Sequence, residues 1–182
     1  ETDFNGETPT ELHYNGDAYH DPPAGNVHLA GSGITYDNNV MYLKDTIPSD
    51  QFYVSFDSNM VGDGDGVALI ISNDSDFTAH RPEQPYGIGG PTGYIVIFDV
   101  WHNATDPGSG DFVAVYRINE SWPHEILVWD TTVPDMDDGV DHTFEVFVDA
   151  GRIQVAIDGT DYIDYDLPSY PYDEVMVGWG AH

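Results

Sequence analysis

The sequence contains no cysteine, only four lysine and arginine side chains and no long apolar run. Without cysteine the 182-residue chain has neither disulfides nor a thiol nucleophile. Only four Lys and Arg side chains stand against 33 Asp and Glu, which gives a formal net charge of -29. Nucleic acid is excluded as a partner, because phosphate contacts need Lys and Arg. No apolar stretch reaches the length of about 18 residues that spans a bilayer, so we expect no membrane insertion.

The acidic excess has two explanations, and both can hold. Carboxylates in this number repel one another, and cations screen that repulsion, which favours a salt-adapted, halophilic source. The other explanation is a secreted protein that binds divalent cations. The chain begins at Glu1 instead of methionine, and it carries three Asn-x-Ser/Thr glycosylation sequons, at Asn73, Asn103 and Asn119. Both features fit an extracellular or cell-surface location.

Short apolar or alternating runs of strand length recur along the chain, bounded by Gly, Pro, Asn and Asp. In 143–149 alternate residues fall on opposite faces, and the following Ala150-Gly151 predicts a hairpin to 152–158. The hydrophobic fraction of 40% is enough for one core. We therefore predict one all-β domain over 1–182, an antiparallel β-sandwich. The runs that predict strands are 51–57, 67–72, 94–99, 112–118, 125–129, 143–149, 152–158 and 174–179.

Residues 93–112, GYIVIFDVWHNATDPGSGDF, lead from an apolar strand into a loop rich in oxygen-bearing side chains. Asp99 ends the strand, the Trp101 carbonyl and the Asn103 amide follow at alternate positions, and Asp106 turns the chain back. Calcium takes about six to eight oxygen ligands of these kinds. The spacing fits a calcium site. In a protein with 33 acidic residues, an ordinary acidic loop remains the alternative.

Two other stretches each have two interpretations. Asp65 belongs to an Asp-Gly-Asp-Gly stretch before the run 67–72, which is either a turn or a carboxylate placed to bind vicinal sugar hydroxyls. Gly89 and Gly90 lie in the long connection 73–92. They provide either flexibility or a bare backbone N–H for a ligand.

The order of these stretches is more informative than each alone. GDGVALIIS, then the Gly-Gly loop, then YIVIFDVWHNATDP resembles the legume or L-type lectins. DHTFEVFVDAGRIQVAIDGT is similar to a hairpin of that family, and EVMVGWGA to its late strand. The resemblance covers residues 25–181 and implies a concanavalin A-like jelly roll.

The resemblance also implies site residues. Calcium would be held by Asp99, Trp101, Asn103 and Asp106, and Asp111 is included among the metal candidates. A monosaccharide would be bound by Asp65, Gly89, Gly90 and Asn103, with the Trp101 ring stacked on it. Ile97 and Asp111 stand where the family has the glutamate and histidine of a transition-metal site, so calcium alone is implied.

The resulting hypothesis is calcium-dependent binding of glycans or cell-surface polysaccharide, without catalysis. The alternative is a structural or adhesive module of the same fold that uses calcium for rigidity or self-association. A glycoside hydrolase ranks third, since the Glu-x-Asp-x-x-Glu run typical of such enzymes on this fold is absent. Glycosylation of Asn103 would abolish both of its implied roles.

Overall fold

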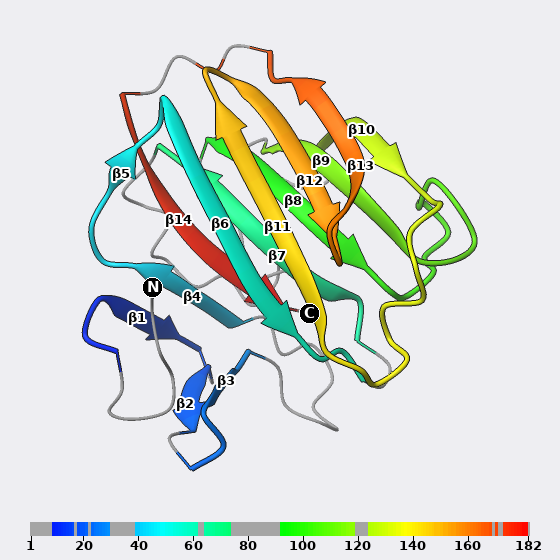
Figure 1. The fold of residues 1–182 in the computed structure, drawn as a ribbon, viewed down its shortest axis with the longest axis horizontal. Helices are drawn as coiled ribbons and strands as arrows, with labels where there is room; N and C mark the ends of the chain where they lie inside the picture. The colour runs from blue at the N-terminus through cyan, green and yellow to red at the C-terminus, as the bar shows by residue number, and fades with distance from the viewer. Residues whose placement is uncertain are drawn as a thin grey trace.

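Two antiparallel sheets face each other in the computed structural model of the chain (Figure 1). The structure describes residues 9–16, 18–21, 23–29, 39–61, 64–73, 92–118, 124–168, 170 and 173–181. These ranges contain strands and no helix, which confirms the predicted all-β sandwich. Accordingly, no helix within them is long and apolar enough to cross a membrane.

The larger sheet has eight strands, and its centre combines segments that lie far apart in the sequence. Its order is β1 (Leu12–Asn15), β4 (Asn39–Leu43), β14 (Glu174–Ala181), β7 (Gly66–Ser72), β8 (Gly93–Asp99), β9 (Phe112–Ile118) and β10 (Glu125–Asp130), while β5 (Ile47–Pro48) pairs with β14. β7 and β8 are buried on both faces. This double burial explains why both strands are continuous apolar runs rather than alternating ones.

The smaller sheet has the order β13 (Thr160–Asp166), β12 (Arg152–Ile157), β11 (His142–Asp149) and β6 (Gln51–Ser58). The predicted hairpin between β11 and β12 is confirmed: Ala150 and Gly151 have φ of 49° and 87°, as a tight two-residue hairpin requires. A separate two-stranded hairpin joins β2 (Tyr19–Asp21) and β3 (Asn26–His28).

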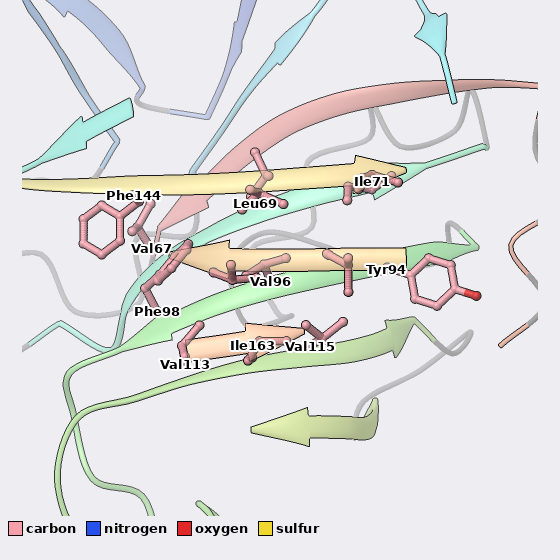
Figure 2. Packing of buried hydrophobic residues seen from close by; sticks show 14 of the residues in the cluster. Val67, Leu69, Ile71, Tyr94, Val96, Phe98, Val113, Val115, Phe144 and Ile163 are labelled. Carbon is pink, nitrogen blue, oxygen red and sulfur yellow. The ribbon is translucent and has the colours of Figure 1, made fainter. Parts of the chain in front are cut away.

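The main core lies between the two sheets (Figure 2). Phe144, Val146 and Val148 of β11 are fully buried, as their alternation predicts, while Glu145 and Phe147 face the other way. The Phe144 ring packs against the Phe98 ring of β8 with centroids 4.5 Å apart. This packing fixes β8, and with it the loop that follows, against the smaller sheet.

Candidate functional site

The first feature of the site is the place where β7 begins and β8 ends. The ladder pairs Gly66 with Asp99, so the Asp-Gly turn and the loop after β8 lie at the same end of the sheet. The Val100 amide donates to the Asp65 carbonyl at 2.9 Å and extends this pairing by one step. Gly66 has φ of +133°, and a Cβ there would lie 2.1 Å from the Phe98 carbonyl oxygen. Only glycine allows the two strands to approach so closely.

The loop after β8 is folded by its own carboxylates. The Trp101 amide donates to Asp99 Oδ1 at 3.1 Å. The Asn103 amide donates to Asp106 Oδ2, and the Asp106 amide donates to the Asn103 carbonyl at 3.2 Å. Asp99 is only 6% exposed. The chain is thus bent so that Asp99, Asn103 and Asp106 lie within one short loop.

Asp99 and Asp106 act on the same neighbour. Tyr116 of β9 is buried, and burial is the main reason why its pKa lies well above the ordinary value. The negative charges of Asp99 and Asp106 raise this pKa further. Both carboxylates therefore act electrostatically on the same buried phenol.

Asn103 connects the two halves of the site. Its Nδ2 donates to Asp65 Oδ1 across 3.5 Å, from the loop after β8 to the turn before β7. The neighbouring Trp101 is 46% exposed, so its ring is accessible to a ligand. The structure therefore brings Asp65, Asp99, Trp101, Asn103 and Asp106 to one end of the β7–β8 pair. Gly89, Gly90 and the sequon residue Asn119 lie outside the described residues.

Asp111 has different neighbours. Its Oδ2 accepts a hydrogen bond from the Met136 amide at 2.7 Å, and burial raises its pKa above the ordinary value. Ligand atoms of Asp111, Asp135 and Asp137 lie within 4.8 Å of one another, which is the one such group of three acidic or histidine side chains among the described residues. Asp135 and Asp137 were not among the site residues predicted from the sequence. The only signal for them was the acidic run at 135–138.

The sequon residue Asn73 lies at the other end of β7. It is exposed, and its Oδ1 accepts a hydrogen bond from Thr92 Oγ1 at 2.6 Å. Its distance from the Asp65 turn along β7 separates it from the site residues.

No protein-family model matches the sequence, and no curated protein matches it either. Solved structures do match the fold. The Emp47p carbohydrate recognition domain superposes with a TM-score of 0.72 at 16% identity, covering 96% of this chain and 81% of that one. The exoplasmic/lumenal domain of VIP36, in its Ca2+/Man3GlcNAc-bound form, superposes with a TM-score of 0.72 at 16% identity, covering 94% of this chain and 76% of that one. The metal-free Emp46p carbohydrate recognition domain superposes with a TM-score of 0.71 at 11% identity, covering 94% of this chain and 80% of that one.

These likenesses extend over nearly the whole chain. They agree with the resemblance carried by the sequence motifs and with the concanavalin A-like sandwich predicted from them. The chain has the fold of the L-type lectin carbohydrate recognition domains.

Proposed function

We propose that the end of the β7–β8 pair is a calcium-dependent carbohydrate site, and that the chain is an extracellular or cell-surface lectin-like module without catalysis. The observation that carries the proposal is the contact of Asn103 with Asp65, which joins the calcium candidates to the sugar candidates. The likeness to carbohydrate recognition domains supports it, as do VIP36 structures with Ca2+ and mannose oligosaccharides.

The residues present fit calcium. The candidate ligands are the carboxylates of Asp99 and Asp106, the amide oxygen of Asn103 and the backbone carbonyl of Trp101. All four are hard oxygen donors, and water completes the usual number of about six to eight. The burial of Asp99, which is only 6% exposed, is the second observation that supports a cation, since buried charges are paired or bind metals. When bound, calcium would hold the loop 99–106 in one conformation.

The sugar would bind next to this loop. The Asp65 carboxylate accepts hydrogen bonds from sugar hydroxyls, and the Asn103 amide donates one. The exposed Trp101 ring offers an apolar face on which a pyranose stacks. Because the cation orders the loop in advance, the sugar loses less conformational entropy on binding. Sugar binding should therefore require calcium.

Calcium binding is tested by thermal unfolding of a chelator-stripped sample, in about 1 M NaCl to screen diffuse attraction to the acidic surface. At free calcium 100-fold above Kd, stability should rise by about 2.7 kcal/mol. Asp99→Asn should lose most of this increment. Asp45→Asn removes the same charge from an exposed position outside the site and should retain it. If calcium leaves the melting temperature of the unmodified chain unchanged, the cation site is wrong.

Sugar binding is tested on a glycan array in the presence of calcium. Asp65→Ala should lose glycan binding and keep calcium stabilisation, while Asp45→Ala should keep both. A chain that calcium stabilises but that binds no glycan would contradict the sugar proposal. In that case, calcium-induced filaments or sheets would identify the structural or adhesive module instead.

A further inference from the structure

The outer face of the smaller sheet is a second surface with a chemistry of its own. Figure 1 looks onto β6, β11, β12 and β13, and no described element packs over them. Alternation along these strands turns every second side chain away from the core. This face belongs to the sheet opposite β7 and β8, so it is separate from the proposed calcium site.

Two aromatic side chains lie on the β6–β11 side of this face. Tyr53 of β6 and Phe147 of β11 are register partners, and their side chains project side by side from the sheet. Tyr53 is 57% exposed, and its hydroxyl donates to Glu145. Tyr53 is exposed and Phe147 is half-buried beside it, at positions where polar side chains would suit a surface that only meets water.

A depression of about 140 Å³ lies beside these rings. The register explains it: Ala156 stands between Glu145 and Asp161 in one row across the sheet, and its methyl group leaves space between the two longer side chains. Gln154 and the two aromatic residues complete the wall. The depression therefore combines aromatic surface with a carboxylate on either side of a small residue.

The charge around the depression has one sign. Six outward carboxylates of the described residues surround it, namely Asp57, Glu145, Asp149, Asp161, Asp164 and Asp166. The single outward basic residue of these strands is Arg152, and its guanidinium is held by both oxygens of Asp164. A cation that approaches this face meets a strongly attractive field.

We propose that this face binds a cationic partner, a basic segment of another protein whose lysine or arginine side chain enters the depression. The ammonium or guanidinium group contacts the Tyr53 and Phe147 rings through cation–π attraction. Glu145 and Asp161 accept charge-assisted hydrogen bonds from it. The outlying carboxylates steer the basic segment toward the sheet and fix its orientation.

Other occupants fit less well. A second copy of this chain, with its charge of -29, would place like charges against one another. An anionic glycan is repelled for the same reason. A neutral glycan would stack on the rings and donate hydroxyl hydrogen bonds to Glu145 and Asp161, but the outlying carboxylates would give it no net electrostatic attraction.

The test uses fluorescence anisotropy of labelled oligolysine and oligoarginine peptides with the full chain, in chelator, with a neutral Gly-Ser peptide for comparison. Any polyanion attracts such peptides, so the variants must distinguish binding at this face from diffuse attraction to the rest of the acidic surface. Glu145→Gln/Asp161→Asn should weaken binding about fivefold at low salt. Asp45→Asn/Asp173→Asn removes equal charge elsewhere and should change binding by less than about twofold.

A second pair of variants tests the rings without changing charge. Tyr53→Leu/Phe147→Leu should weaken the basic peptides about fivefold, with arginine peptides affected more than lysine peptides. Trp129→Leu, at a residue 51% exposed on β10, should have no effect. Unchanged melting temperatures confirm that each variant is folded.

The proposal is overturned if all variants bind basic peptides equally, since the attraction is then diffuse. It is also overturned if the ring variants abolish self-association or neutral-glycan binding instead. Asp99→Asn should leave peptide binding intact. A failure of the proposal for the cationic partner is therefore distinguishable from a failure of the proposed calcium site.

Discussion

Replacing Gly66 with alanine would place a methyl group where β7 and β8 come closest together. The added Cβ would lie 2.1 Å from the Phe98 carbonyl oxygen and 3.2 Å from the Asp99 Cα, both of them backbone atoms. Contacts below 3.0 Å are essentially never seen for a real Cβ, so the two strands must separate. The φ of +133° adds conformational strain for any residue with a side chain.

The expected cost follows from these two effects. An unfavourable backbone conformation costs about 1–3 kcal/mol. A backbone shift forced by overpacking costs about 1–3 kcal/mol more. The sum of about 2–6 kcal/mol is a large part of a total stability of about 5–15 kcal/mol. Urea denaturation with linear extrapolation measures it directly.

Two other glycines provide controls. Gly93, at the opposite end of the same strand pair, has φ of +150° and would place its Cβ 2.1 Å from the Ile71 carbonyl oxygen. Gly93→Ala should therefore destabilise the chain as much as Gly66→Ala. Gly159 has φ of +73° and open space around it, so Gly159→Ala should cost only about 1–2 kcal/mol.

The two strongly destabilising variants, Gly66→Ala and Gly93→Ala, should differ in whether calcium stabilises them. Gly66 follows Asp65 in the sequence and is the register partner of Asp99, whereas Gly93 lies at the far end of the same strand pair. Gly66→Ala should lose the calcium-dependent increment in stability, and Gly93→Ala should keep it. The reasoning is refuted if Gly66→Ala is as mild as Gly159→Ala, or if calcium stabilises both severe variants equally.

Three further predictions concern the histidines and the core. The hydrogen bond to Asp158 raises the pKa of His142 above 6.5, so His142→Asn should lower Tm most below pH 6.5 and least at alkaline pH. Burial lowers the pKa of His124 to about 4, so the NMR signal of its imidazole should titrate near that pH, and stability should fall as the pH drops from 6.5 toward 4. Titration of His124 near 6.5 would contradict its burial. Phe144→Ala should cost about 3–5 kcal/mol in urea unfolding, and Phe147→Ala, facing outward on the same strand, much less; equal losses would disprove the assignment of faces.

Much of the fold could be predicted, because side-chain periodicity determines which face of a strand is buried. The inward residues of β11 and the hairpin at Ala150-Gly151 follow directly from that rule. The tyrosine-rich segment 162–174 was expected to form an edge strand and a turn, and residues 162–166 belong to β13, at the edge of the smaller sheet. Among the first fifty residues, the short strands β1 to β5 were not resolved individually, because runs of two to five residues carry too little periodicity.

The candidate site could be predicted in part. The convergence of Asp65 with Asn103 was expected from the resemblance to the L-type lectins, and the antiparallel pairing of β7 with β8 accounts for it, because it brings the start of one strand to the end of the other. The grouping of Asp111 with Asp135 could not be predicted, because it depends on the path of the loop 131–141, and no side-chain periodicity encodes that path. The roles of these residues in binding stay predictions.

The position of β14 has a consequence for how the chain folds. This strand lies between β4 and β7 in the larger sheet, and about a hundred residues separate it from β7 in the sequence. Until residues 174–181 arrive, the facing edges of β4 and β7 expose unpaired amides and carbonyls beside apolar side chains. Such long-range closure makes folding slow and leaves a template onto which a strand from another molecule can add. We expect the dense negative charge of the chain to oppose such pairing, because it makes incompletely folded molecules repel one another.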